Sequence, residues 1–137
     1  MRVFFDTSAF VKRYVEEPGS DEVQALLVEA EQIVVSALCL PECLSALQRL
    51  RREDRLTTDE HGWLKDAILA DLAGSEVCHL VPEVIDASVA CLERHALRTL
   101  DAVHLGSALV VDPSLFVSGD RRLIEAGRSE GLAVRLV

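Results

Sequence analysis

Short apolar runs alternate along this chain with longer segments of helical spacing, and this alternation constrains the fold more than any other feature. The runs are rich in Val, Ile, Leu and Phe, which is typical of strands buried on both faces of a parallel sheet. The segments between them carry Leu, Val and Ala at helical spacing. The pattern predicts one α/β domain over residues 1–137, a three-layer sandwich with helices on both faces of a mostly parallel sheet.

The expected elements can be bounded from the apolar pattern. The expected strands are Val3–Phe5, Ile33–Ser36, Val77–Val81, Leu115–Val117 and Ala133–Val137. The expected helices are Ser8–Val15, Asp21–Glu31, Ala37–Glu53, Asp59–Leu72, Glu83–His95 and Asp101–Val111. Thr57 and Glu60 fit a capping box at the start of the fourth helix.

Four acidic residues lie where a strand gives way to a helix or in a helix's first turns: Asp6, Glu42, Asp101 and Asp120. In an open parallel sheet, the segments just beyond the carboxyl ends of the strands converge on one crevice. Four carboxylates in one crevice repel each other unless a divalent cation lies among them. The sequence therefore predicts an Mg²⁺ or Mn²⁺ site.

Each acid also has a simpler interpretation. Asp6, Asp101 and Asp120 could each be an ordinary residue at a helix amino terminus, where the helix dipole favours a carboxylate. Glu42 is harder to explain in this way, because it lies between Leu40 and Leu44, where an unpaired carboxylate is costly to bury. The four together are more specific than any one alone.

The charge balance limits the way in which this chain could bind nucleic acid. Its 14 Lys and Arg residues are outnumbered by 23 Asp and Glu residues, which gives a net charge of −9. Proteins that coat nucleic acid are usually basic, so any such contact should be local. Arg121 and Arg122 adjoin Asp120 and are the candidates for touching a phosphate. The basic cluster from Arg49 to Arg55 is interpreted as a solvated helix face.

The cysteines and the apolar segments indicate the cellular setting. Cys39, Cys43, Cys78 and Cys91 form no Cys-x-x-Cys pair and lie in apolar segments, so we expect reduced thiols in the core. The chain begins without a signal-peptide core, and its longest apolar stretch, Ala102–Val111, is too short to span a bilayer. We expect a soluble, cytoplasmic protein with no membrane partner.

Four fragments in a fixed order carry a family resemblance that covers the whole chain. They are Phe5-Asp6-Thr7-Ser8, Glu42 within an apolar helix, the segment Asp101 to Ala108 with the pattern Asp-Ala-x-His-Leu-x-x-Ala, and Ser118-Gly119-Asp120. In this order the chain resembles the PIN-domain ribonucleases, and within them the small VapC-like toxins of prokaryotic toxin–antitoxin pairs.

The resemblance implies a PIN-like fold and a metal-dependent endoribonuclease that hydrolyses RNA phosphodiester bonds. Its catalytic residues would be the four acids, which would hold Mg²⁺ or Mn²⁺ directly or through water. Ser118 would position Asp120 or a metal-bound water, and Thr7 or Ser8 would brace Asp6. His104 is expected to be a packed helix residue rather than a ligand.

The chain departs from the family pattern at one position, and several other protein classes must be compared with the nuclease interpretation. Some relatives carry a further acid two positions after the last Asp, where this chain has Arg122, which leaves one-metal and two-metal action open. Receiver domains and haloacid-dehalogenase-type phosphatases need a late lysine, whereas the lysines here are Lys12 and Lys65. A dinucleotide-binding domain would need a glycine-rich turn after the first strand. The main alternative is a non-catalytic PIN-fold module that binds RNA or protein.

The apolar content also suggests a protein partner. The helices Ser8–Val15, Asp21–Glu31 and Ala37–Glu53 carry more Leu, Val and Ala than one sheet face needs, so we expect part of that surface to meet another chain. The resemblance implies a homodimer whose helical groove takes an amphipathic antitoxin segment, with a basic side chain reaching the acids.

Overall fold

The computed structural model describes all residues 1–137 as a five-stranded sheet with the strand order β3-β2-β1-β4-β5. All four strand pairings are parallel, and Phe4 in the central strand is in register with Val34 and Phe116. The strands are β1 (Arg2–Phe5), β2 (Gln32–Ser36), β3 (Glu76–Cys78), β4 (Leu115–Ser118) and β5 (Val134–Leu136).

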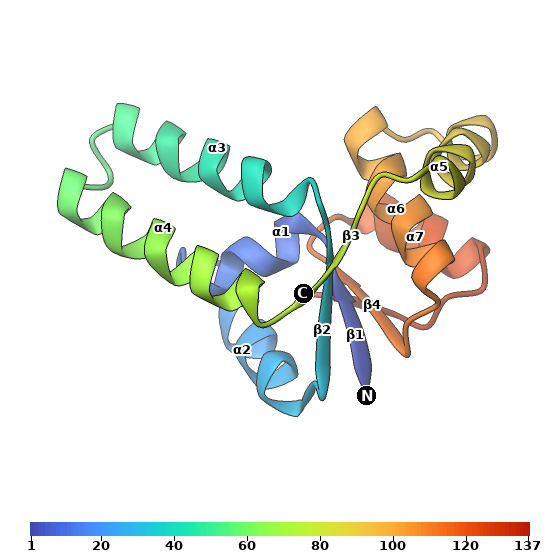
Figure 1. Cartoon of the computed structure of the whole chain (residues 1–137), viewed down its shortest axis with the longest axis horizontal. Helices are drawn as coiled ribbons and strands as arrows, with labels where there is room; N and C mark the ends of the chain where they lie inside the picture. Colours follow the sequence, from blue (N-terminus) through green and yellow to red (C-terminus); the bar gives the residue numbers. More distant parts are fainter.

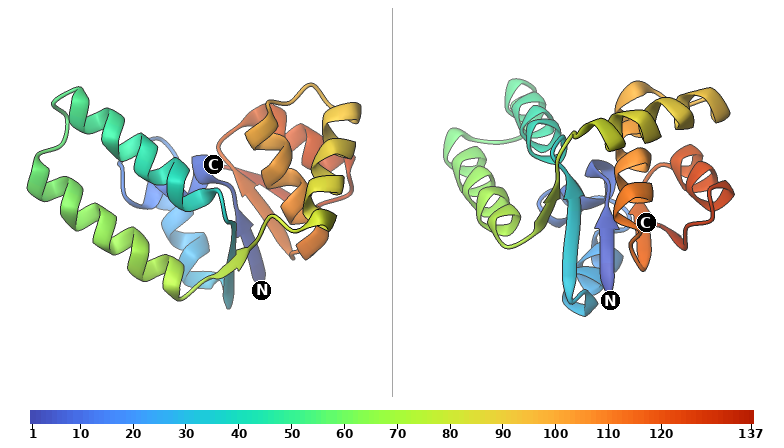
Figure 2. Two further views of the ribbon diagram at one scale, coloured as in Figure 1. Left: turned by 45° about the horizontal axis from the view of Figure 1, so that its top comes forward. Right: turned by 45° about the vertical axis from the view of Figure 1, so that its right-hand side comes forward.

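Helices cover both faces of this sheet, which confirms the predicted three-layer sandwich (Figures 1 and 2). They are α1 (Thr7–Phe10), α2 (Ser20–Glu29), α3 (Cys39–Arg52), α4 (Thr58–Ala73), α5 (Pro82–Arg94), α6 (Thr99–Val111) and α7 (Arg121–Ser129), with a 3-10 turn at Val11–Arg13. Helices α1 to α4 lie on one face and α5 to α7 on the other (Figure 1). None of them combines the length and apolarity that a membrane crossing requires.

Two hydrophobic cores explain why the strands are almost continuously apolar. Successive side chains of a strand point to opposite faces. Val3 and Phe5 belong to the core under α1 to α4, whereas Phe4 belongs to the core under α5 to α7. Phe4 also packs on Phe116, with ring centroids 5.7 Å apart. Burial of each such side chain stabilises the fold by roughly 1.5–3 kcal/mol.

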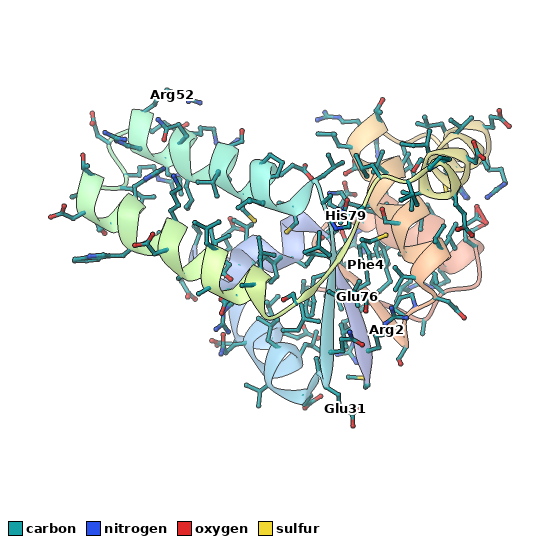
Figure 3. The ribbon with its side chains drawn as sticks, in the orientation of Figure 1. Arg2, Phe4, Glu31, Arg52, Glu76 and His79 are labelled. Atoms are coloured by element: carbon teal, nitrogen blue, oxygen red, sulfur yellow. The ribbon has the colours of Figure 1, made fainter.

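Polar contacts fasten the outer elements. The predicted capping box at the start of α4 is present: Glu60 N donates to Thr57 Oγ1 at 3.1 Å, and Thr57 N donates to Glu60 Oε1 at 3.0 Å. At the opposite edge of the sheet from the acids, Arg2 of β1 forms an ion pair with Glu76 of β3 (Figure 3). All four cysteines are free. Cys39, Cys43 and Cys91 are buried as predicted, whereas Cys78, at the end of the edge strand β3, is only partly buried.

Most elements differ from the sequence prediction by one or two residues at their ends, and three differ more. The first helix is a single α turn followed by a 3-10 turn, and β3 ends at Cys78, so that Leu80 and Val81 are exposed loop residues. Helix α7 is not among the predicted helices, although Asp120 caps it and Leu123, Ile124 and Ala126 form its buried face. A Cβ at Gly127 would lie 3.3 Å from both Phe116 and Val134, so close packing of α7 on the sheet favours glycine there.

The three helices of the predicted partner surface bury most of their large apolar side chains within the chain itself. Val28 is the only large apolar residue of the three named helices that is exposed, because α1 to α4 pack on one another as well as on the sheet. Exposed apolar side chains lie on and just before α5, at Val81, Ile85, Val89 and Leu92, and on α4, at Trp63 and Leu69.

Candidate active site

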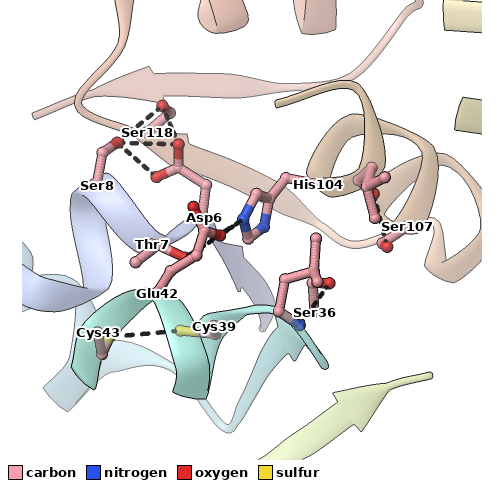
Figure 4. A network of polar contacts seen from close by, with 12 residues as sticks. Asp6, Thr7, Ser8, Ser36, Cys39, Glu42, Cys43, His104, Ser107 and Ser118 are labelled. Carbon is pink, nitrogen blue, oxygen red and sulfur yellow. Dashed lines mark hydrogen bonds and ion pairs between the residues drawn. The ribbon is translucent and has the colours of Figure 1, made fainter. Parts of the chain in front are cut away.

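Asp6 directly follows the central strand β1 and caps the amino terminus of α1. Its Oδ1 accepts hydrogen bonds from Ala9 N at 2.9 Å and Ser8 Oγ at 2.8 Å. Its Oδ2 accepts a hydrogen bond from Ser118 Oγ at 2.6 Å, as Figure 4 shows. The side chain is almost fully buried. Asp6 is therefore held in one orientation by groups from β4 and α1.

Burial and hydrogen bonding act in opposite directions on Asp6. Burial raises the pKa of the Asp6 carboxyl, and this effect exceeds the opposing charge of His104 and the hydrogen bonds from Ser118, Ala9 and Ser8. The raised pKa means that the ionised form lies in an unfavourable environment, which a nearby cation would relieve.

Glu42 lies in the first turn of α3 and is held through one oxygen. Its Oε1 accepts a hydrogen bond from Thr7 Oγ1 at 2.9 Å and lies 2.5 Å from His104 Nε2 (Figure 4). Burial opposes ionisation of Glu42, but the hydrogen bonds and charge of His104, with the bond from Thr7, lower its pKa. Both contacts use Oε1, so Oε2 is left without a hydrogen bond.

His104 is packed inside α6, with 2% of its surface exposed, in agreement with the predicted helix histidine. Its contact with Glu42 was missed from the sequence, where the two residues are 62 positions apart. Because a carboxylate only accepts, Nε2 is the donor in this contact. The other ring nitrogen, Nδ1, is buried and has no hydrogen-bond partner.

Asp101 lies in the first turn of α6 and is the least satisfied of the four acids. Its half-buried carboxylate accepts no hydrogen bond within the protein. Burial, then the charge of Asp120, raises the pKa of Asp101; Glu42 adds to this effect, while His104 and Arg98 oppose it. A carboxylate whose ionised form is disfavoured by neighbouring acids, and which makes no hydrogen bond that stabilises the fold, indicates a functional role.

Asp120 caps the amino terminus of α7. Its Oδ1 accepts hydrogen bonds from Arg122 N at 2.8 Å and Leu123 N at 3.3 Å, and its Oδ2 accepts none. Ser118 Oγ accepts a hydrogen bond from Asp120 N at 2.9 Å while it donates to Asp6. Ser118 therefore links the two aspartates through one hydroxyl.

A hollow of about 750 Å³ lies beside two of the acids. It is lined by Ala96, Leu97, Arg98, Asp101, Asp120, Arg121 and Arg122. The predicted phosphate contacts, Arg121 and Arg122, are exposed on its wall. The two acids and the arginines thus share one solvent-accessible space.

The structure places all four acids at the carboxyl edge of the sheet. Asp120 and Glu42 lie close enough for their charges to raise the pKa of Asp101. The supporting residues divide in an unexpected way: Ser8 braces Asp6, whereas Thr7 holds Glu42. No three His, Cys, Asp or Glu side chains are grouped closely enough to hold a metal ion by themselves.

A family comparison identifies the fold around these acids. The family model for the PIN domain matches residues 3–129. The chain belongs to the PIN domain family. Two PIN-domain relatives from Mycobacterium tuberculosis (strain ATCC 25618 / H37Rv) support this assignment. Ribonuclease VapC49 is 37% identical over 134 residues, covering 96% of this chain and 93% of its own length. Ribonuclease VapC46 is 33% identical over 139 residues, covering 96% and 95%.

Solved structures share the PIN-domain architecture at low sequence identity. Mycobacterium tuberculosis VapC20, described as a toxin that cleaves the sarcin-ricin loop, is 15% identical with a TM-score of 0.71, covering 96% of each chain. VapBC2 from Rickettsia felis, bound to a DNA fragment from its promoter, is 12% identical with a TM-score of 0.70, covering 100% of this chain and 99% of that one. At these identities the likeness shows the fold alone.

Proposed function

We propose that this PIN-domain protein is an endoribonuclease that depends on Mg²⁺ or Mn²⁺ and hydrolyses RNA phosphodiester bonds. The observation that carries the proposal is Asp101, a half-buried carboxylate without a hydrogen bond whose pKa is raised by burial and by neighbouring acids. A divalent cation offsets this repulsion. The ribonuclease names of the relatives at 33–37% identity favour RNA as the substrate.

The residues at the site fit a hard divalent cation by the chemistry of their donors. Glu42 Oε2, both oxygens of Asp101 and Asp120 Oδ2 accept no hydrogen bond, so these oxygens are free for ligation. Mg²⁺ prefers oxygen ligands and keeps several waters, so carboxylates that are not tightly grouped can still hold it. Asp6, Glu42, Asp101 and Asp120 would hold the ion directly or through water.

The chain's own residues orient the acids and the substrate. Ser8 and Ser118 fix Asp6, while Thr7 and His104 fix Glu42. A bound Mg²⁺ or Mn²⁺ would supply positive charge for the phosphate and lower the pKa of a water. Arg121 and Arg122, beside Asp120, would bind a phosphate oxygen through their guanidinium groups. Hydrolysis would leave a 5′-phosphate and a 3′-hydroxyl.

The biological role that fits best is the toxin of a toxin–antitoxin pair acting in the cytoplasm. Several structural neighbours carry such names, including a toxin-antitoxin complex from Klebsiella pneumoniae that is 15% identical with a TM-score of 0.63, covering 86% of each chain. A cationic side chain from an amphipathic antitoxin segment would replace the metal's charge among the four acids. The protein would act as a homodimer, and the exposed apolar side chains of α5 support an interface of this kind.

A cleavage assay tests the nuclease. Purified protein is incubated with single-stranded RNA in Mg²⁺, Mn²⁺ or EDTA, and the product ends are determined. We expect cleavage only with the divalent ion, with 5′-phosphate ends, and none from Asp101→Asn. RNA binding without cleavage under every metal condition would favour the alternative, a non-catalytic binding module.

The partner is tested separately. A short reading frame beside the gene, with a DNA-binding amino-terminal half and an amphipathic tail, would be co-expressed and its product added to the assay. We expect inhibition that competes with Mg²⁺ and weakens at high salt. A neighbouring protein that binds without changing cleavage, or a chain that is strictly monomeric at micromolar concentration, would contradict this part while leaving the nuclease intact.

A further inference from the structure

The arginines of this acidic chain divide into paired and unpaired groups. Arg2, Arg13, Arg55, Arg94, Arg128 and Arg135 each form an ion pair with a glutamate or aspartate. Arg49, Arg51, Arg52, Arg98, Arg121 and Arg122 form none, although the chain carries 23 acidic residues. Unpaired guanidinium groups on a protein of net charge −9 are available to an anionic ligand.

Five of the six unpaired arginines flank the acids on two sides. On one side, Arg98, Arg121 and Arg122 line the hollow of about 750 Å³ that contains Asp101 and Asp120. On the other side, a smaller hollow of about 220 Å³ is lined by Glu42, Ser45, Ala46, Arg49 and Arg52. Each hollow therefore joins proposed catalytic acids to unpaired arginines.

The arginines beside Glu42 lie in a row along α3. Glu42, Ala46, Arg49 and Arg52 follow one another at spacings of three or four residues, so they share one face of α3. With a rise of 1.5 Å per residue, Arg49 lies about 10 Å and Arg52 about 15 Å along the helix from Glu42. Arg52 lies at the outer end of α3 (Figure 3).

The hollow beside Asp101 and Asp120 adjoins a second hollow farther from the acids. Ala96, Leu97, Arg121 and Arg122 line a further hollow of about 840 Å³, which extends to His95 and Ala126. Its wall combines Arg94, Arg121 and Arg122 with the apolar side chains of Ala96, Leu97 and Ala126, and also includes Glu125. Such a hollow suits an unstacked base whose phosphate is bound by arginine, and unstacked bases belong to single-stranded RNA and loops rather than to duplexes.

We propose that a single RNA strand crosses the four acids, with its phosphates bound by Arg49 and Arg52 on one side and by Arg98, Arg121 and Arg122 on the other. This inference rests on the proposed function in placing the cleaved phosphate at the acids. It extends that function by assigning a track of several nucleotides on both sides of the cut. Arginine suits this role because its planar guanidinium group matches phosphate oxygens.

The chain offers a matched control for each side. Arg51 is an unpaired arginine on α3, but it donates to Thr58 Oγ1 at 3.5 Å and lines neither hollow. Arg128 lies on α7 like Arg121 and Arg122, but it is paired with Glu125 and lies outside the hollows. Substitution of either control removes one positive charge from the same helix, half of what the matching double variant removes.

The first experiment measures binding without cleavage. In an Asp101→Asn background with Mg²⁺, the affinity for a fluorescent single-stranded RNA is measured as salt is varied. Each phosphate contact to a single strand contributes about 0.7 to the slope of log K against log salt. We expect the double variants R121Q/R122Q and R49Q/R52Q each to lower the slope by about 1.4, and R51Q and R128Q to leave it unchanged.

The second experiment uses the otherwise native protein and measures KM and kcat for the same RNA. We expect both track variants to raise KM with little change in kcat, and neither control to do so. Track variants that match their controls in slope and KM would overturn the inference while native cleavage upholds the nuclease. If the native protein cleaves no RNA but both double variants lower the salt slope of RNA binding as expected, the result would uphold the track and overturn the nuclease. Altered antitoxin binding with unchanged RNA binding would assign these arginines to a protein partner and overturn the track.

Discussion

His104 Nε2 lies 2.5 Å from Glu42 Oε1, and this contact joins α6 to α3 across the carboxyl edge of the sheet. The histidine is buried, and Thr7 donates to the same oxygen of Glu42. Two donors on one oxygen fix the carboxylate and leave its other oxygen free. We infer that His104 positions Glu42.

The first prediction concerns His104. His104→Leu removes the donor, so Glu42 loses its fixed orientation, and we expect a loss of about 10-fold to 100-fold in Mn²⁺ affinity. His104→Gln restores an N–H donor near the position of Nε2 and should recover most of that affinity. The measurement is the rise in melting temperature with Mn²⁺, accompanied by cleavage rates. Equal Mn²⁺ affinity in the native protein and a folded Leu variant would contradict the positioning role.

A second prediction concerns the stability cost of Asp101. Because the folded-state pKa of Asp101 is raised, the native protein is destabilised as pH rises past the unfolded pKa and through the folded one. Asp101→Asn should therefore raise the melting temperature at pH 7 in EDTA. Each 1 kcal/mol gained corresponds to roughly 3–5 °C for a chain of this length. At pH 3 Asp101 is largely protonated in both the folded and the unfolded protein, so thermal unfolding there should show no such gain. A gain of equal size at pH 3 would refute the charge explanation.

The third prediction concerns the link between α5 and α7. Glu130 accepts from Arg94 Nε at 2.7 Å and lies 3.1 Å from His95 Nε2. Burial opposes ionisation, but the bonds from Arg94 and His95 lower the pKa of Glu130. Its contribution is therefore present above the unfolded pKa of about 4.3 and lost as pH falls through the folded value.

Glu130→Gln should accordingly lower the melting temperature at pH 7 by no more than about 3 °C, since the pair is near the surface. Melting curves between pH 7 and pH 2.5 should converge as the carboxylate is protonated in the native protein. Glu125→Gln is the control, because the Glu125–Arg128 pair is exposed and lies within α7. A difference that persists undiminished at pH 2.5 would mean that the ion pair is not its cause.

A fourth prediction concerns the packing of α6 on α5. A Cβ at Gly106 would lie 2.5 Å from Ser88 Oγ and 2.7 Å from Ser88 N, so backbone would have to move. We expect Gly106→Ala to destabilise the fold by about 1–3 kcal/mol. Gly62 in α4 has nothing within 4 Å of its Cβ position, so Gly62→Ala should stabilise the fold by about 0.5–1 kcal/mol. Chemical denaturation measures both, and a neutral Gly106→Ala would disprove the tight contact.

The features that the sequence predicted well depend on local pattern. Phe4 and Phe5 are buried on opposite faces of the sheet, so both had to be apolar, and the strand is visible as an uninterrupted run. Asp6 directly follows β1, and Asp120 lies two residues after the end of β4. The carboxyl ends of the strands meet at one edge in any parallel sheet. Their positions at the carboxyl edge follow from order along the chain alone.

The features that the sequence did not predict depend on contacts between distant residues. Glu42 and His104 meet only because α3 and α6 both start at the same edge of the sheet. Helix α7 is an exception, because its cap Asp120 and its apolar face of Leu123, Ile124 and Ala126 are local signals that could have predicted it. The exposed apolar face of α5 has the same composition as a buried helix, so only the structure separates it from the core.

The most direct test of an acid cluster that works through a divalent ion is the rate of RNA cleavage as Mn²⁺ is titrated into metal-free protein. We compare the native chain, Asp101→Asn, and Arg128→Gln as a surface control. We expect no cleavage in EDTA, a saturable rise with Mn²⁺ in the native chain and the control, and a loss of about 10³-fold or more in a folded Asp101→Asn. Cleavage that persists in EDTA, or a folded Asp101→Asn as active as the native chain, would contradict the proposal.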